Sequence, residues 1–167
     1  FDYPIISTNI LYLKKVKKFL KKFKIKNYSI ILEPIKKNTA PAILSTTLLN
    51  EIPSNQPMIF FPADHLIENP NKLCRSIKRY IKYFDEKKIF IFGIKPNNIS
   101  TQYGYFQTKK SGKINKVIKF IEKLNIKNAK KIIKSNAYWN SGILFARKDS
   151  IIKNFKIHQP KIYDICN

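Results

Sequence analysis

Short apolar runs alternate with amphipathic segments along the first part of the chain, and this alternation constrains the fold more than any other feature. Runs typical of strands occupy residues 3–7, 28–32, 58–61 and 88–93. Between them, residues 9–24 place apolar side chains at helical spacing opposite a lysine-rich face, and residues 40–50 and 69–84 also favour helices. Strands and helices in this order predict an α/β fold, with a mostly parallel Rossmann-like sheet and helices on both faces.

The pattern changes after Gly93. Residues 103–108, 112–120 and 138–146 favour strands, whereas residues 125–134 and 150–155 favour helices. Thr39 is expected to be the N-cap of the helix over residues 40–50, and Asn69 or Asn71 that of the helix ending near residue 84. No linker or repeat interrupts the chain, so we expect residues 1–167 to form one domain.

The net charge of +23 raises the question of nucleic-acid binding. Of the 33 basic residues, Arg75, Arg79 and Arg147 are arginines and the others are lysines. Isoleucine and asparagine are also abundant, and all three residue types have AT-rich codons. A nucleic-acid-binding surface more often uses arginine for bidentate contacts. We therefore favour a composition bias over a nucleic-acid partner, although the charge suits anionic substrates.

No segment has the composition of a membrane anchor or a secretion signal. An apolar run of about 18 residues would be needed to span a bilayer, and the sequence contains none. Charged and apolar residues are interleaved from the start, unlike a signal peptide. We expect a cytoplasmic protein without a membrane partner.

Two carboxylates follow strand-like runs and are the first candidates for chemistry. Glu33 comes after the second run and Asp64 after the third. Open α/β sheets bind ligands at the carboxyl ends of their strands, and an exposed carboxylate there suits a Mg²⁺ ion that bridges phosphates. The alternative is a turn or helix-cap role. His65 could add a ligand, but a structural role is favoured for a lone histidine.

Glycine-rich phosphate-binding loops are missing from these 167 residues. The four glycines are Gly93, Gly104, Gly112 and Gly142, and none forms G-x-G-x-x-G or G-x-x-x-x-G-K-[ST]. No catalytic triad or H-E-x-x-H motif is visible either. The backbone cradle that usually holds a triphosphate is therefore absent from this stretch.

Six blocks, read in order, resemble the mannose-1-phosphate guanylyltransferase family. The two most specific are Asn38 to Ala42 (NTAPA) and Trp139 to Gly142 (WNSG). The six blocks are residues 31–34 with 37–43, 62–67, 92–96, 103–105, 120–123 and 138–145. They cover nearly the whole chain. The resemblance implies a nucleotide-diphospho-sugar transferase fold with inserted sugar-binding strands, consistent with the change of pattern after Gly93.

The resemblance also implies an enzyme that forms GDP-mannose and pyrophosphate from GTP and mannose 1-phosphate. Its nucleotide-binding residues would be Glu33, Asn38, Thr39 and Ala40. A carboxylate such as Glu33 can accept from both N1–H and N2–H₂ of guanine. No covalent enzyme intermediate is needed, so catalysis would be positioning and charge neutralisation.

The remaining roles follow from the same resemblance. Asp64 would hold Mg²⁺ and, with Lys123, form the catalytic group, because Lys123 would meet the sugar phosphate. The sugar-binding residues would be Tyr103, Gly104, Glu122 and Asn140. Gly104 would allow the backbone to pass close to the mannose, where a side chain would obstruct it.

The chain departs from the family pattern in several places. Lys37 replaces an arginine, Ser100 and Gln102 replace glutamate and glycine, and Leu124 replaces a proline. The family's glycine-rich loop and second metal-binding aspartate are absent, so we expect a partial nucleotidyltransferase domain that is inactive or nearly inactive alone. Three alternatives stay open: a non-catalytic remnant, a related enzyme with another base or sugar, and a basic nucleic-acid-binding domain. A homo-oligomer is compatible with the sequence.

Overall fold

The computed structural model describes residues 3–35, 38–85 and 87–167, so Lys37 lies outside the described part of the chain. The chain divides into two compact units. The first comprises Phe1–Pro57, Asp85–Lys87 and Arg147–Asn167, and the second comprises Met58–Phe84 and Lys88–Ala146. The expectation of one domain over residues 1–167 stays a prediction, and each unit is described separately below.

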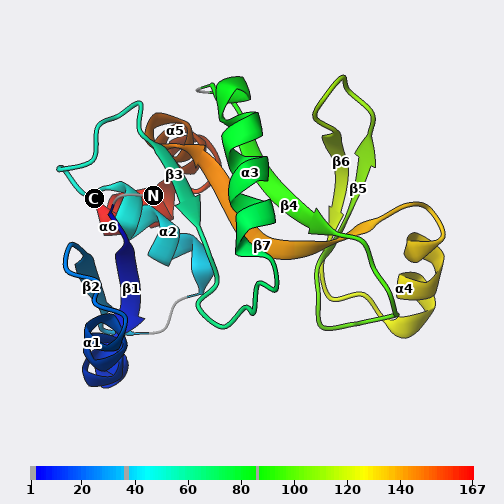
Figure 1. Cartoon of the computed structure of the whole chain (residues 1–167). Coiled ribbons are helices and arrows are strands. Elements are labelled where there is room, and N and C mark those ends of the chain that lie inside the picture. The colour runs from blue at the N-terminus through cyan, green and yellow to red at the C-terminus, as the bar shows by residue number, and fades with distance from the viewer. Residues whose placement is uncertain (1–2, 36–37, 86) are drawn as a thin grey trace. The chain divides into compact units, whose positions relative to one another are not determined.

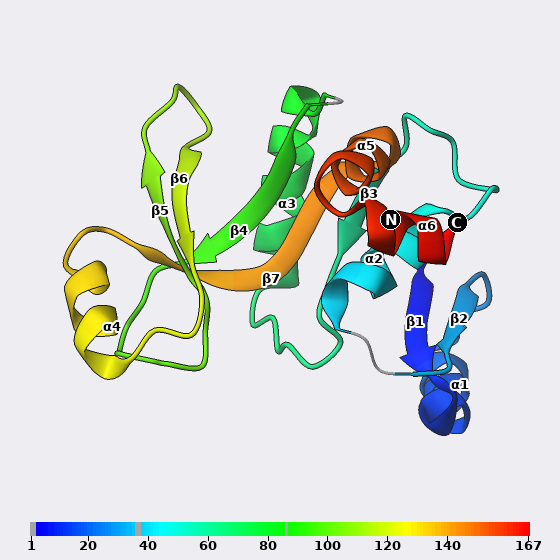
Figure 2. The ribbon, with the colours of Figure 1, turned by 180° about the vertical axis from the view of Figure 1, so that it is seen from behind.

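The first unit combines a pair of parallel strands with several helices. Its elements are β1 (Ile5–Asn9), η1 (Ile10–Tyr12), α1 (Leu13–Lys22), β2 (Ser29–Glu33), α2 (Thr39–Thr47), α5 (Lys148–His158) and α6 (Pro160–Cys166). The strands β1 and β2 lie side by side, with Ile5 opposite Ser29 and Asn9 opposite Glu33 (Figure 1). The helices α2, α5 and α6 contact one another (Figure 2).

Helix starts in this unit agree with the sequence pattern in one case and correct it in another. Asn9 accepts a hydrogen bond from the Leu11 N–H at 3.0 Å, where the predicted helix over residues 9–24 begins as η1 and α1. The N-cap of α2 is Asn38, with φ 74°, and Thr39 is already helical. The prediction of Thr39 as N-cap was wrong, because Thr39 already has a helical backbone, whereas an N-cap residue has non-helical dihedral angles, as Asn38 does.

A buried lysine holds the segment that follows α2. Lys148 is 7% exposed, and its ammonium group donates to the backbone oxygens of Leu49 and Ile52 at 2.6 and 2.8 Å. Its own N–H donates to the Gln56 oxygen at 3.0 Å. Burial of a charge is tolerated where hydrogen bonds compensate for lost hydration. Lys148 therefore joins the start of α5 to the loop between α2 and the next strand.

The second unit holds nearly all of a five-stranded sheet. Its elements are β3 (Pro57–Phe60), α3 (Pro70–Tyr80), η2 (Ile81–Tyr83), β4 (Ile89–Ile94), β5 (Tyr105–Lys109), β6 (Lys116–Ile121), α4 (Ile126–Ile133) and β7 (Tyr138–Arg147). The strand order is β3-β7-β5-β6, and β4 also pairs with β7. Asn69 caps α3 by accepting from the Lys72 N–H at 2.9 Å, as one of the two predicted alternatives.

The α/β class is confirmed, but the strand directions differ from a mostly parallel sheet. The pair β1–β2 is parallel, whereas β4–β7, β5–β6 and β5–β7 are antiparallel. The physical reason lies in the connections. A short turn joins β5 to β6, and a short turn can link only antiparallel strands. Residues after Gly93 thus supply hairpin-like strands rather than further crossover units.

Aromatic and aliphatic side chains form the core of the second unit on the α4 side of the sheet. Tyr105, Ala129, Ile132, Ala137 and Trp139 form one buried cluster. Ala129 and Ile132 come from α4, whose N-cap Asn125 accepts from the Asn128 N–H at 2.8 Å. This packing fixes β5 and β7 next to each other and so determines where the residues before Tyr105 lie.

Candidate active site

Glu33 ends β2 within a small polar group. Its side chain is half-buried, and its Oε1 accepts a hydrogen bond from the Ser7 hydroxyl. The Asn9 side-chain amide donates to the Glu33 backbone oxygen at 3.0 Å. A carboxylate can accept about four hydrogen bonds. Glu33 could therefore accept further hydrogen bonds from a ligand. The carboxyl end of the β1–β2 pair therefore presents an oriented acceptor group.

The start of α2 is the second feature of the first unit that could bind a nucleotide. Asn38, Thr39 and Ala40 are exposed. The first N–H groups of a helix have no intrahelical acceptor, and the helix dipole favours acceptors or negative charge there. The side chain of Asn38 makes no cap hydrogen bond to the first turn of α2. All four predicted nucleotide-binding residues thus belong to the first unit.

Asp64 lies in the loop after β3, in the second unit. Its side chain is 90% exposed, and its Oδ1 is 4.0 Å from His65 Nε2. The same loop packs on β7, because a Cβ built at Gly142 would lie 2.9 Å from Pro62 Cγ and 3.9 Å from His65 Cε1. The carboxylate of Asp64 is therefore presented to solvent beside the Asn140–Gly142 segment.

The Asn140-Ser141-Gly142 segment forms a bulge in β7. The pairing with β4 shifts between Ile91, opposite Leu144, and Gly93, opposite Asn140, so β7 contains extra residues there. Asn140 Oδ1 accepts from the Gly142 N–H at 3.1 Å, and Ser141 Oγ accepts from the Ile143 N–H at 3.2 Å. Gly142 has φ +71°. The motif thus supplies its own hydrogen-bond partners where the ladder is interrupted.

Three of the predicted sugar-binding residues meet around the backbone of Gly104. The Asn140 N–H donates to the Gly104 oxygen at 2.8 Å. A Cβ at Gly104 would lie 3.5 Å from Glu122 Cγ and 3.6 Å from Glu122 Oε1. The Tyr103 ring, 46% exposed, precedes Gly104 and lies 5.1 Å from the Trp139 ring. The structure therefore brings Tyr103, Gly104, Glu122 and Asn140 together.

Lys123 lies next to this group. It follows Glu122 directly, is exposed, and has a left-handed backbone with φ 53°. A positive φ is uncommon in a residue other than glycine, and it turns the chain sharply after β6. The exposed ammonium group of Lys123 is thus a positive charge on the residue that follows Glu122.

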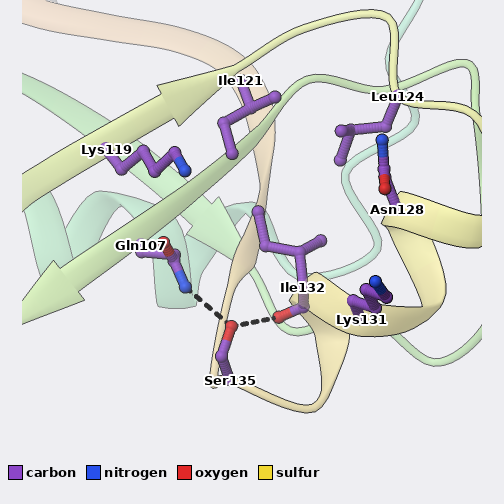
Figure 3. A pocket seen from close by; sticks show the side chains of 8 residues that line it. All are labelled: Gln107, Lys119, Ile121, Leu124, Asn128, Lys131, Ile132 and Ser135. Atoms are coloured by element: carbon purple, nitrogen blue, oxygen red, sulfur yellow. Dashed lines mark hydrogen bonds between the residues drawn. The ribbon is translucent and has the colours of Figure 1, made fainter.

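A separate hollow of about 460 Å³ lies between the β5–β6 hairpin and α4 (Figure 3). None of the predicted site residues lines it. Gln107 Nε2 donates to Ser135 Oγ at 2.7 Å, and Ser135 Oγ donates to the Ile132 oxygen at 2.7 Å (Figure 3). These polar groups already have partners, so we place the site around Gly104 and Asn140 rather than in this hollow.

The side chains of the candidate site could hold a metal ion only with the help of a substrate. Among the residues that the structure describes, no group of three or more histidine, cysteine, aspartate or glutamate side chains could hold an ion. Mg²⁺ keeps several waters and is often bound by one or two carboxylates together with substrate phosphates. The exposed carboxylate of Asp64 fits this mode and does not fit a cage made only of protein ligands.

Sequence reasoning missed some polar partners of the predicted site. Ser7 and Asn9 were assigned to a strand and a helix start, yet both contact Glu33. Ser7 and Asn9 are two residues apart, and this spacing places both side chains on one face of β1. That spacing is the sequence signal that could have linked them. Their pairing with Glu33 depends on the parallel register, which no local pattern reveals.

Polar side chains at strand ends and in loops, which occur in each unit of this mixed α/β scaffold, are typical of proteins that bind small polar ligands. The chain belongs to the nucleotidyl transferase family, whose model matches residues 5–167.

Individual relatives have more specific names. The chain is 32% identical over 173 residues to a mannose-1-phosphate guanylyltransferase of Escherichia coli, covering 98% of this chain and 37% of the relative. It is 31% identical to the alginate biosynthesis protein AlgA of Pseudomonas syringae pv. tomato, covering 98% and 35%.

Solved structures support the same fold. A crystal structure of mannose-6-phosphate isomerase from Helicobacter pylori superposes with a TM-score of 0.87 at 28% identity, covering 99% of this chain and 63% of that one. A Thermus thermophilus structure described as mannose-1-phosphate geranyltransferase gives 0.82 at 18% identity, covering 97% and 47%, and shows the fold alone.

The chain spans a little over a third of the length of the curated relatives described above. In the part of the chain that the structure describes, no helix has both the length and the apolarity to cross a membrane.

Proposed function

We propose that the protein carrying this chain transfers a guanylyl group from GTP to mannose 1-phosphate and releases pyrophosphate. The observation that carries the proposal is the gathering of Tyr103, Glu122 and Asn140 around the Gly104 backbone. Relatives named mannose-1-phosphate guanylyltransferase match 98% of the chain and support the same reaction.

The first unit would bind the guanine. Glu33 would accept from guanine N1–H and N2–H₂ while Ser7 holds one of its oxygens. Asn38 and the first-turn N–H groups of Thr39 and Ala40 would donate to acceptor atoms of the base or ribose. Adenine offers a different donor and acceptor pattern, so this arrangement favours guanine.

The second unit would bind the sugar phosphate. Glu122 and Asn140 would hydrogen-bond mannose hydroxyls, and the Tyr103–Gly104 backbone would pass close to the sugar ring. Lys123 would neutralise the phosphate as a point charge. A phosphate oxygen of mannose 1-phosphate would attack the α-phosphorus of GTP as the bond to the β-phosphate breaks, so pyrophosphate leaves without a covalent enzyme intermediate.

Asp64 is the residue that would hold Mg²⁺. The ion, when bound, would neutralise phosphate charge. Asp64 would orient it from the loop that packs on Gly142, so the position of the carboxylate depends on that packing. The rest of the catalysis would be positioning by Glu33, Glu122 and Lys123.

The direct test is pyrophosphate release by the protein as its gene encodes it. GTP, ITP and ATP would each be combined with mannose 1-phosphate or glucose 1-phosphate in the presence of Mg²⁺. We expect turnover with GTP and mannose 1-phosphate to exceed every other pair. Faster turnover with another pair would indicate a different sugar or base specificity. The absence of pyrophosphate release with all pairs would contradict the proposal.

Replacement of Glu33 by glutamine is expected to raise KM for GTP by about tenfold to a hundredfold, because a charge-assisted bidentate acceptor is lost. ITP lacks the 2-amino group, so its KM should change less. Steady-state KM values for both nucleotides measure this difference. Glu51→Gln, an exposed carboxylate after α2, is the matched control. An equal loss with ITP and GTP would contradict base reading by Glu33.

Gly104→Ala is expected to raise KM for mannose 1-phosphate by about tenfold or more and to leave KM for GTP unchanged. Inside the chain the new methyl group meets Glu122 at ordinary van der Waals distance, and Gly104 does not need a left-handed backbone. Folding should therefore survive, with a stability change within about 1 kcal/mol. An unchanged sugar KM would show that the sugar does not approach Gly104.

Three further expectations belong to the same proposal. The 167 residues contain no glycine-rich phosphate loop, so the chain expressed alone should turn over far more slowly than the full gene product.

Both substrates are water-soluble, which favours a cytoplasmic location. We favour a composition bias as the source of the charge, so nucleic acid should not compete with GTP.

A further inference from the structure

The loop between β4 and β5 is held from the core side by two aromatic residues that the proposed reaction does not use. We infer that Tyr105 and Trp139 are positioning residues, which set the place of the Ser100–Gly104 backbone and thereby the affinity for the sugar phosphate. The link to the sugar phosphate rests on the proposed function, whereas the anchoring of the loop does not.

Tyr105 anchors the start of this segment. Its side chain is completely buried, and its hydroxyl donates to the Ser100 oxygen at 2.8 Å. The same hydroxyl accepts from the Ser100 N–H at 3.2 Å. Both bonds go to the backbone, so they do not depend on which side chain occupies position 100. A single hydroxyl thus satisfies both backbone polar groups of one loop residue, Ser100.

Trp139 supports the end of the segment. It is 8% exposed, and its ring lies 5.1 Å from that of Tyr103 and 6.5 Å from that of Tyr105. Its indole Nε1 is buried and has no hydrogen-bond partner among the described residues. A buried N–H without an acceptor costs free energy, so stability alone would favour a purely apolar ring at this position. The size of the indole instead suits the support of Tyr103.

The anchored segment ends in Tyr103 and Gly104, two of the proposed sugar-binding residues, and Glu122 and Asn140 lie around Gly104. Besides the two aromatic supports, the Asn140 N–H donates to the Gly104 oxygen at 2.8 Å. The Cβ direction of Gly104 leads to Glu122 and Phe120, whereas Tyr105 and Trp139 pack with Ala129 and Ile132 of α4. The supports therefore hold the loop without occupying the side on which Glu122 lies. A loop held in advance loses less conformational entropy when a ligand binds.

Tyr105→Phe removes the hydroxyl and keeps the buried ring, so it tests this inference. We expect faster amide hydrogen exchange at residues 98–104 and unchanged exchange in β5 and β7, measured by mass spectrometry of the full-length protein. KM for mannose 1-phosphate should rise about fivefold to tenfold, while KM for GTP stays constant. A variant that only destabilised the fold would lower the active fraction and the melting temperature, but would not raise the KM for one substrate.

Two further variants complete the test. Tyr163→Phe removes a tyrosine hydroxyl in α6 of the first unit and should change neither readout. Trp139→Phe removes the unpaired N–H and shortens the support under Tyr103, so it should raise the sugar KM in the same direction.

The outcomes separate the inference from the proposed function. Unchanged exchange at residues 98–104 in Tyr105→Phe would overturn the inference whatever the activity. Wild-type turnover together with an unchanged sugar KM in the variant would also overturn it. Faster exchange in the variant of a protein that turns over no sugar phosphate would overturn the proposed function and the link to sugar affinity. That result would support the anchoring by Tyr105.

Discussion

Asp64→Asn is expected to lower kcat for guanylyl transfer by about a thousandfold. The amide keeps the size of the carboxylate but loses the negative charge that would bind Mg²⁺. The side chain is 90% exposed, so its replacement removes no buried contact and the melting temperature should stay the same. Pyrophosphate release at increasing Mg²⁺ concentration measures both effects, and half-saturation should shift to a higher Mg²⁺ concentration in the variant.

Glu68→Gln is the matched control for this experiment. Glu68 is another exposed carboxylate in the loop between β3 and α3, and it has no role in the proposed reaction. Its replacement should leave kcat and the Mg²⁺ dependence as they are in the wild type. If Asp64→Asn kept wild-type kcat at every Mg²⁺ concentration, Asp64 would be a turn residue rather than a metal ligand.

Gly142→Ala is expected to destabilise the protein by about 2–4 kcal/mol. Two costs combine at this position. A residue with a Cβ is strained at φ +71°, and the Cβ would lie 2.9 Å from Pro62 Cγ. The proline ring is rigid, so the loop that carries Asp64 must move or the bulge in β7 must change. Urea unfolding followed by circular dichroism measures the loss of stability.

Gly112→Ala separates the two costs. Gly112 has nearly the same backbone conformation, φ +67°, but a Cβ there would meet nothing within 4 Å. It should cost about 1 kcal/mol, from backbone strain alone. Equal losses in the two variants would show that the contact between Gly142 and Pro62 does not hold the loop.

Much of the secondary structure follows from local signals. The helical spacing of apolar residues predicted α1 and α4, and Asn69 and Asn125 cap their helices as asparagine commonly does. The helix α6 was missed, although Pro160 at its first turn is a recognised start signal. The end of α2 was predicted too late: the helix stops at Thr47, where Thr46 and Thr47 hydroxyls bond the carbonyls of the preceding turn.

The sequence suggested a set of candidate residues, but it did not suggest how they are arranged. Tyr103, Glu122 and Asn140 are far apart in sequence. Strand pairing between β5, β6 and β7 brings all three to the backbone of Gly104. The polar partners of Glu33 depend on the register of β1 against β2. Pairing between distant segments is decided by side-chain packing over the whole sheet, which local patterns do not encode.

The amino-acid sequence by itself determined the α/β class, most helix starts and the identity of the candidate residues, because periodicity, capping and motif chemistry are local properties. Tertiary structure alone decided the antiparallel pairing after Gly93, the bulge that presents Asn140, and the two aromatic supports beneath the Ser100–Gly104 loop. The pairing, the bulge and the packing of Trp139 on Tyr103 depend on contacts between segments that are distant in sequence. Those contacts form only when the apolar faces of β5, β7 and α4 pack into one core.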